Sequence, residues 1–487
     1  MPDANPLHLD LQATAKEIMI EHGFEPDFAP LVSAQLASLR QQPPTLANGA
    51  VRDLRHLLWS SIDNDTSRDL DQIEVAARAP NDSVTIMVGI ADVDAFVSRQ
   101  TPIDQHAARE TTTVYTGIRN FPMLPEELST GATSLLENQD RLSVVIEFTV
   151  DSAGNLNGSD VYRALVRNQA QLQYNSVGAW LEGRAPAPAK VASSAELQTQ
   201  LKLQDEIAQR LKTQRFQQGA LNLQTDETHP IVLNSQVVDI GAQPKNRATE
   251  LIEDFMIAAN GVVARLLINV SSIRRIVRTP KRWDRIVQLA ATKGEKLPAE
   301  PDSKALNDLL LRRKAADPDH FADLSLSVIK LIGPGEYVVE RPGDVISGHF
   351  GLAVQDYTHS TAPNRRFADV ATQRLIKAML AGQKNPYSDD ELMAIAANCT
   401  QMEDAARKVE REMSKRLAAV AMQSHIGQVF DAIVTGATDR GTFVRVLQPH
   451  IEGLLAQGEQ GLDVGDKLRA KLIRTDARKG YIDFARA

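Results

Sequence analysis

The segment Ser61-Ile62-Asp63-Asn64-Asp65-Thr66-Ser67-Arg68-Asp69-Leu70-Asp71 places four carboxylates within nine residues. Like charges at this density repel one another unless cations bind among them. Carboxylate oxygens are the ligands that hard divalent cations such as Mg²⁺ and Mn²⁺ prefer. Alternate side chains of an extended segment lie on one face, and a chain that bends around a metal has the same effect, so the four aspartates are expected to converge. The segment therefore predicts a site for a divalent cation.

Length and composition bound the class of protein. A chain of 487 residues is too long for one hydrophobic core and predicts about two to four domains. The most apolar long stretch, Leu251–Val270, contains Glu253, Asp254 and Arg265, which excludes a membrane span. The N-terminus lacks the pattern of a secretion signal, and the single cysteine, Cys399, excludes an intrachain disulfide. These features predict a cytoplasmic protein.

The charge balance gives an ambiguous signal about a nucleic-acid partner. The chain carries 54 Lys and Arg against 62 Asp and Glu, a formal net charge of -8, which by itself argues against such a partner. Basic residues are nevertheless concentrated locally, as at Arg274-Arg275, Arg312-Arg313-Lys314 and Arg365-Arg366. An acidic exterior can therefore contain a basic channel, although each cluster alone also fits a solvated helix face.

Three regions differ in their sequence pattern. Residues 1–48 have apolar side chains at helical spacing up to Pro43-Pro44, which predicts a small helical domain, either helix-turn-helix-like or a cap on its neighbour. Residues 49–424 predict one large mixed α/β domain, with β-rich runs at Ser83–Ile90 and Leu142–Val150 and helical periods at Glu196–Arg215, Thr249–Leu267, Ala368–Leu380 and Glu391–Met422. In residues 425–487, four short strands are predicted at Gln428–Val434, Gly441–Val446, Lys467–Ile473 and Gly480–Phe484. This texture is typical of the five-stranded β-barrel of the OB fold.

Five strings follow one another between residues 62 and 366. They are Ile62–Asp71, Gly89-Ile90-Ala91-Asp92-Val93, Phe121-Pro122-Met123-Leu124-Pro125, His349-Phe350-Gly351-Leu352 and Ala362-Pro363-Asn364-Arg365-Arg366. In this order and rough spacing, the chain resembles the ribonuclease II / ribonuclease R (RNB) family. The last region resembles the OB-fold RNA-binding domain that ends those enzymes, with Gly441-Thr442-Phe443-Val444 at its signature position.

This resemblance implies a processive 3′-to-5′ exoribonuclease that hydrolyses single-stranded RNA to nucleoside 5′-monophosphates. Phosphodiester hydrolysis needs a nucleophilic hydroxide and relief of negative charge in the transition state, and cations held by carboxylates provide both. By matching position, Asp63, Asp69 and Asp71 inherit metal-binding or water-activating roles with Mg²⁺, or Mn²⁺ as the alternative. Arg365 matches an arginine that contacts the phosphate near the metal, a role that suits its planar fork of donors.

One position departs from the pattern of the family. A further Asp normally follows the one matched by Asp71, whereas this chain has Gln72. An amide oxygen can ligate a hard cation but contributes no negative charge. The expected ligands are therefore Asp63, Asp69, Asp71 and Gln72, and we expect a higher Mg²⁺ requirement than in relatives with all four acids. Asp65 is one candidate for compensation.

Further matched positions imply contacts to RNA. Tyr115 matches a tyrosine that packs on the 3′-terminal nucleotide, and Tyr174 matches one near the RNA path. Glu253 lies in a helix that matches a family helix whose acid helps to sense the ribose. Arg366 is assigned to phosphate binding or to supporting Arg365. In the OB barrel, a stacking platform with a nearby cation is predicted from Phe430, Phe443 and Arg445. Core packing is the alternative for the aromatic residues, and a polar helix face is the alternative for Glu253.

Two other classes of function compete with the exoribonuclease prediction. Six side chains from Asp63 to Glu74 fall at the ligand positions of an EF-hand loop, but Arg68 stands where the sharp turn calls for Gly. A catalytically weakened RNA-binding adaptor is the second alternative, because Gln72 shows that the acidic motif has changed.

The access of RNA to the site is predicted from the N-terminal region. Family members usually carry two OB barrels ahead of the catalytic region, and residues 1–48 are too few to build them. We therefore expect weaker discrimination against duplexes, with structured RNA that has a 3′ overhang also accepted. Separately, the protein is expected to be a monomer.

Overall fold

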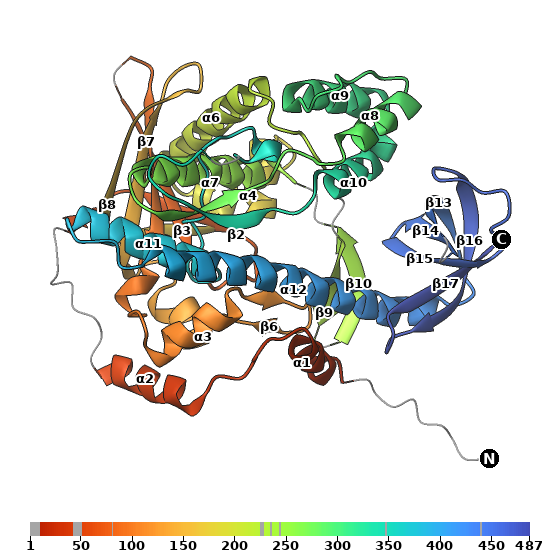
Figure 1. The fold of residues 1–487 in the computed structure, drawn as a ribbon, viewed down its shortest axis with the longest axis horizontal. Helices are drawn as coiled ribbons and strands as arrows, with labels where there is room; N and C mark the ends of the chain where they lie inside the picture. Colours follow the sequence, from red (N-terminus) through yellow and green to blue (C-terminus); the bar gives the residue numbers. More distant parts are fainter. Residues whose placement is uncertain are drawn as a thin grey trace.

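The structure is a computed structural model that describes residues 10–41, 51–79, 81–224, 228–233, 236–242, 245–345, 348–438 and 441–487. Figure 1 shows a mixed α/β body, a separate β-barrel at the C-terminal end, and one long helix that runs from the body to the barrel. The predicted fold class is confirmed in each of these features. Within the described ranges, none of the helices combines the length and apolarity that a membrane span requires.

The body is built on a six-stranded sheet in the order β1-β8-β2-β3-β4-β7. Strand β8 pairs with β7 over residues 156–167 and with β2 over residues 168–173, so one long strand closes the sheet into a ring. Alternate residues of β4, from Val84 to Ile90, are almost fully buried on one face, as period-two patterning predicts. The strands are β1 (Arg52–Asp53), β2 (Trp59–Asp63), β3 (Gln72–Arg78), β4 (Val84–Ala91), β7 (Asp140–Val150) and β8 (Leu156–Gln173).

Helices cover this sheet and complete the main core. Helix α7 begins with a capping box in which Asn246 and Thr249 satisfy each other's backbone N–H groups, and 13 of its 20 residues are buried. The helices of the body are α3 (Pro102–Glu110), α4 (Tyr174–Leu181), α5 (Ala189–Ala192), α6 (Ala195–Gln217), α7 (Arg247–Leu266) and α11 (Phe367–Leu380). Short strands flank them at β5 (Val114–Tyr115), β6 (Asn120–Phe121), β9 (Thr228–Leu233), β10 (Gln236–Ala242), β11 (Ser272–Ile276) and β12 (Glu336–Glu340).

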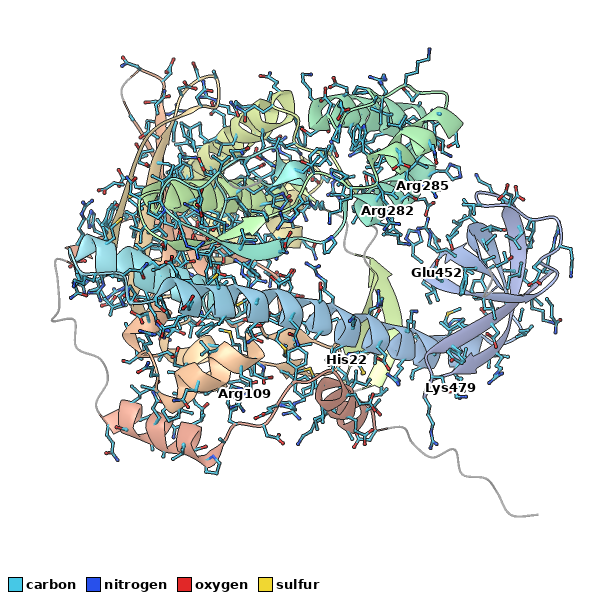
Figure 2. All side chains as sticks on the ribbon, in the orientation of Figure 1. His22, Arg109, Arg282, Arg285, Glu452 and Lys479 are labelled. Carbon is cyan, nitrogen blue, oxygen red and sulfur yellow. The ribbon has the colours of Figure 1, made fainter. Side chains whose placement is uncertain are left out.

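Helix α12 (Asp389–Met422) has 34 residues and is therefore about 51 Å long. Helix α1 (Leu11–Glu21) packs its buried side chains against α12, and His22 Nε2 lies 3.3 Å from Glu412 Oε2 (Figure 2). Helix α2 (Pro30–Gln41) instead packs on α3 and joins the main core through Val32 and Leu36. The two predicted N-terminal helices are thus present, and each contacts a different part of the body. The predicted boundary at residues 48 and 49 lies outside the described residues.

The C-terminal strands form a closed barrel in the order β13-β14-β15-β17-β16. Four of these strands were predicted, whereas β15 was missed. In β15, Gly453 stands where a side chain would collide with the Ile482 carbonyl and the Phe484 ring, so close backbone packing replaces an apolar side chain there. The strands are β13 (Val429–Thr438), β14 (Gly441–Leu447), β15 (His450–Gln457), β16 (Lys467–Asp476) and β17 (Tyr481–Arg486).

A group of three helices stands between the body and the barrel (Figure 1). It has its own apolar core, which includes Trp283, Leu310 and Phe321, and it was not predicted as a separate unit. The helices are α8 (Trp283–Thr292), α9 (Ser303–Ala316) and α10 (Phe321–Ile332).

A buried network of ion pairs fixes α11 against the sheet. Lys377 Nζ lies 2.8 Å from Asp92 Oδ1 and 2.8 Å from Asp94 Oδ2, and Arg163 Nη2 lies 3.3 Å from Asp92 Oδ2. Asp92 has no exposed side-chain surface. Its charge is therefore compensated by the two cations rather than by water.

Replacement of Asp92 tests this network. We expect Asp92→Asn to lower the free energy of unfolding by about 3 kcal/mol, because it removes the buried negative charge that Lys377 and Arg163 share. The matched control is Asp308→Asn, which breaks the exposed pair with Lys304 and should cost below about 0.5 kcal/mol. Urea denaturation followed by circular dichroism measures both values. Equal effects of the two substitutions would contradict the role of the network.

Candidate active site

Three segments that are distant in the sequence meet at one end of the sheet. The first is the turn from Asp63 to Gln72, and the others are residues 111–115 and 362–366. The backbone N–H of Thr113 donates to the Arg365 carbonyl at 3.1 Å, and the backbone N–H of Asn364 donates to Asp71 Oδ1 at 2.8 Å. Hydrogen bonds donated by backbone N–H groups thus hold the three segments together, and the acidic turn lies at their junction.

The acidic turn is shaped by its own polar side chains. Strand β2 ends at Asp63, whose Oδ1 accepts hydrogen bonds from the Asn64 N–H at 2.8 Å and the Ser67 hydroxyl at 2.7 Å. Such side-chain bonds to nearby backbone favour a turn over a continued strand. Ser134 then holds the far end, because its hydroxyl accepts from the Leu70 N–H and donates to the Arg68 carbonyl.

Asp71 is the most desolvated acid of the turn. Its side chain is 2% exposed, and burial raises its pKa to about 8. The Arg365 charge, with Nε 3.4 Å from Asp71 Oδ2, and the Asn364 N–H act in the opposite direction, while the Asp69 charge raises the pKa further. Burial likewise raises the pKa of Asp63, again with a contribution from Asp69. The three acids are therefore close enough for their charges to interact.

The fit of this site to a divalent cation can be judged from its donors. Across the described ranges, no three His, Cys, Asp or Glu side chains form a ready-made metal cluster. The oxygen donors of the three aspartates and of Gln72 nevertheless match the preference of Mg²⁺ and Mn²⁺. The donor chemistry fits the cation, and Arg365 supplies the positive charge next to Asp71 in this structure. Asp65 is exposed in the turn.

The tyrosines and the second arginine stand beside this cluster. Tyr115 donates its hydroxyl hydrogen to Asp69 Oδ2 at 3.1 Å, and 39% of its surface is exposed. Tyr174 begins α4, and burial raises the pKa of its hydroxyl, with further contributions from the charges of Asp63 and Glu74. Arg366 donates two hydrogen bonds to Asp369, at 2.8 and 2.7 Å, so its guanidinium is held within the fold.

Glu253 is placed differently from the tyrosines. Its carboxylate forms an ion pair with Lys245 at 2.6 Å, and 40% of its side chain is exposed. The neighbouring Asp254 is buried and paired with Arg215. The ion pair with Lys245 joins Glu253 to the loop before α7.

Glu74 is a site residue that sequence reasoning considered only as an EF-hand position. It lies in strand β3, so no exiting helix follows and the EF-hand alternative is wrong. The side chain is 0% exposed, and its pKa is raised well above the usual range by burial and by the charge of Asp63. The sequence contained one indication that Glu74 belongs to the site. Glu74 lies two residues after Gln72, a predicted cation ligand, and side chains two residues apart lie on one face of a strand.

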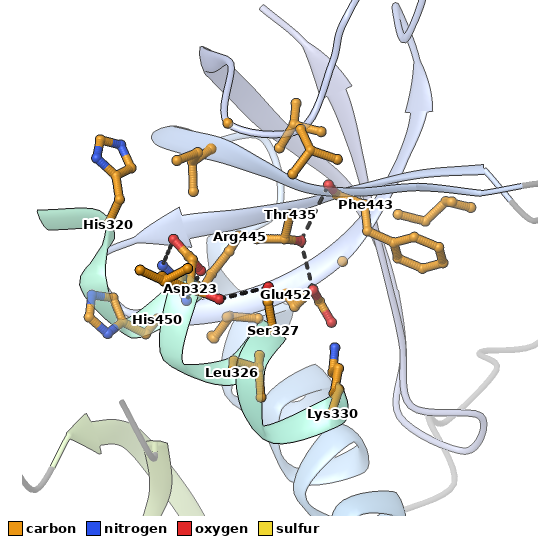
Figure 3. Close-up of a pocket in the computed structure, with 18 of the residues that line it drawn as sticks. His320, Asp323, Leu326, Ser327, Lys330, Thr435, Phe443, Arg445, His450 and Glu452 are labelled. Carbon is orange, nitrogen blue, oxygen red and sulfur yellow. Dashed lines mark hydrogen bonds and ion pairs between the residues drawn. The ribbon is translucent and has the colours of Figure 1, made fainter. Parts of the chain in front are cut away.

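The barrel residues line a cavity apart from the acidic turn. Figure 3 shows this cavity of about 970 Å³ between α10 and the barrel, with Phe443 and Arg445 in its lining. Arg445 forms a bidentate ion pair with Asp323, with distances of 2.8 and 3.0 Å. Phe430 is half-buried against the barrel core and does not line the cavity. Phe430 thus lies apart from the other two residues of the predicted platform. The cation of that platform, Arg445, is already paired with Asp323 of α10.

Comparisons with known proteins match both parts of the chain. Residues 51–382 match the RNB domain, and residues 428–487 match the RNase II-type exonuclease C-terminal S1 domain. The chain is 31% identical to ribonuclease R of Thermotoga maritima over 89% of this chain and 64% of that protein. It is 30% identical to ribonuclease R of Escherichia coli over 87% of this chain and 53% of that protein. The chain therefore spans between about half and two-thirds of the length of these relatives.

Solved structures agree on the fold. RNase R of Mycoplasma genitalium, in complex with ribose-methylated single-stranded RNA, superposes with a TM-score of 0.87 at 23% identity, over 98% of this chain and 78% of that one. Yeast Ssd1, described as a pseudonuclease, gives a TM-score of 0.72 at 16% identity over 97% and 58%. The same fold therefore occurs in a protein described as a pseudonuclease.

The raised pKa of Asp71 predicts a pH dependence of stability in EDTA. An unfolded Asp loses its proton near pH 3.9, whereas folded Asp71 keeps it up to about pH 8. The contribution of Asp71 to the free energy of unfolding is therefore fully present below about pH 4 and declines as the pH rises to about 8. Urea denaturation across this range should show a steeper decline for the unmodified protein than for Asp71→Asn. Parallel profiles would contradict the assignment.

Proposed function

Because this chain belongs to the RNB family, we propose that it is a metal-dependent, processive 3′-to-5′ exoribonuclease that hydrolyses single-stranded RNA to nucleoside 5′-monophosphates. One observation carries the proposal. The buried Asp71 meets both the Asn364 N–H and the Arg365 guanidinium, and it lies within charge interaction of Asp69. The junction therefore contains both the negative charge that would hold a cation and the arginine that would bind a phosphate.

The cation would be held by Asp63, Asp69 and Asp71, with Gln72 as a neutral fourth donor. When bound, Mg²⁺ would lower the pKa of a coordinated water and offset the charge that develops on the phosphate. Contacts to the RNA itself fall to the protein's side chains, and a side chain that contacts RNA must be exposed. Arg365 meets this condition, because 47% of its side chain is exposed while its Nε faces Asp71.

Asp369 and Glu410 position the side chains that would contact a substrate. Asp369 holds Arg366 with two hydrogen bonds, and Arg366 in turn extends the antiparallel bridge with Thr112 that aligns Arg365. Tyr115 is oriented from both ends, because its hydroxyl donates to Asp69 and its backbone N–H donates to Glu410 at 3.0 Å. A half-exposed ring fixed beside the acids suits stacking on a terminal base of any identity.

The substrate is expected to be RNA in single-stranded form, including a single-stranded 3′ overhang on structured RNA. Tyr174 borders the acidic turn and is assigned to the RNA path. A ribose contact from Glu253 requires its ion pair with Lys245 to open. Phe430, Phe443 and Arg445 are assigned to RNA held by the barrel, and Arg445 would exchange Asp323 for a phosphate. We assign the activity to a monomer in the cytoplasm.

The second candidate is an RNA-binding adaptor without turnover. Two observations support this candidate, namely the neutral Gln72 and the fold shared with yeast Ssd1, a pseudonuclease. Asp63, Asp69, Asp71, Tyr115 and Arg365 are all present in the arrangement described above, which favours the enzyme. The two functions differ in whether bound RNA is shortened.

Turnover of labelled RNA separates these functions. We expect 5′-labelled single-stranded RNA to be converted directly to a very short product with Mg²⁺ or Mn²⁺, while EDTA abolishes the reaction and matching DNA is spared. Asp71→Asn should lower the rate by about 10²–10³-fold or more, because the buried charge of the site is lost. RNA that stays intact but shifts on a native gel would support the adaptor instead.

Replacement of Gln72 by Asp tests whether the number of charged ligands determines the Mg²⁺ requirement. We expect Gln72→Asp to lower the Mg²⁺ concentration needed for half-maximal rate by about tenfold, because a charged oxygen ligand replaces a neutral one. Gln72→Asn is the matched control, since it shortens the side chain by the same amount without adding charge. An unchanged Mg²⁺ dependence in Gln72→Asp would show that position 72 does not face the cation.

A further inference from the structure

Glu74 is a fully buried acid in strand β3. Its side chain is 0% exposed, and neither Oε1 nor Oε2 makes a hydrogen bond to any group in the described part of the chain. Buried polar groups in native proteins almost always have a hydrogen-bond partner, and an isolated buried carboxylate is costly. A side chain of this kind therefore calls for a specific explanation, and a bound ion is one of them.

The position of Glu74 connects it to the acidic turn. It lies in β3 two residues after Gln72, so the two side chains share one face of the strand. In the sheet it stands opposite Ser60 of β2 and Val88 of β4. The charge of Asp63 acts on Glu74, and both of these acids act on Tyr174. Glu74 is thus within electrostatic reach of a predicted cation ligand and of a tyrosine assigned to the RNA path.

We propose that Glu74 belongs to the carboxylate set that holds the divalent cation, and that it supplies the negative charge that the amide at position 72 lacks. This inference rests on the proposed function of the same site. The affinity of an oxygen-ligand site for a divalent cation depends on the number of charged ligands. With Glu74 included, four acids serve the cation although position 72 is neutral.

A purely structural role makes the opposite predictions. If Glu74 merely fills space in the sheet, then Glu74→Gln keeps the shape of the side chain and should leave the affinity for a cation unchanged. If Glu74 supplies charge to the cation, the same substitution weakens binding, and a carboxylate returned at position 72 restores it. The pair of positions 72 and 74 therefore forms a double-mutant cycle with a defined sign.

The test is a titration of the full chain with Mn²⁺ alone, with free Mn²⁺ measured by electron paramagnetic resonance. We expect Glu74→Gln to weaken Mn²⁺ binding by about tenfold or more. We expect Glu74→Gln combined with Gln72→Asp to recover most of that loss. The matched control is Glu340→Gln, which changes a buried glutamate paired with Arg274 and should leave Mn²⁺ binding unchanged. Glu74→Leu, checked by circular dichroism, replaces Glu74→Gln if the latter does not fold.

The outcomes separate this inference from the proposed function. If the unmodified protein binds Mn²⁺ and Asp71→Asn does not, while Glu74→Gln binds as the unmodified protein does, the inference is overturned and the proposed function stands. Failure of Gln72→Asp to restore binding in the Glu74→Gln protein also overturns the inference. If the unmodified protein binds no Mn²⁺, the metal-dependent function and the inference fail together.

Discussion

A carboxylate removed from water is the constraint on which the rest of the structure depends. Asp71 is almost fully buried, and burial of an ion costs several kcal/mol unless charges and hydrogen bonds compensate it. Asn364 and Arg365, which lie more than 290 residues away in the chain, meet only part of this cost, because burial still raises the pKa of Asp71 to about 8. These two residues precede α11, and the buried ion pairs of Lys377 fix that helix to the sheet. The site therefore depends on the helix that directly follows its arginine.

The same reasoning explains the connection between the barrel and the body. Arg445 of the barrel and Asp323 of α10 form two parallel contacts, a geometry that fixes orientation as well as distance. Helix α12 provides the second connection, because its last turns pack into the core of the barrel. The cavity between these connections has cations and aromatic rings in its lining (Figure 3). RNA that contacts the barrel there would compete with Asp323 for Arg445.

The elements that sequence reasoning found are those with strong periodicity. Strands β4 and β7 and helices α6, α7, α11 and α12 were predicted within a few residues, because their apolar side chains repeat with a period of two or of 3.6 along one buried face. Strand β15 was not predicted, because its contact within the barrel at Gly453 is made by the backbone and not by an apolar side chain. The helices α8 to α10 carry a core of their own, and no motif marked them as a unit.

The sequence by itself determined the family, the fold class and the acids of the turn, because these depend on residue types at fixed spacing. Only the tertiary structure decided which partners those residues have. It paired Arg365 with Asp71, paired Arg445 with Asp323, and buried Glu74 with no hydrogen-bond partner among the described residues. The physical reason is that spacing along the chain fixes which face a side chain occupies, whereas burial and charge compensation depend on segments that are hundreds of residues apart.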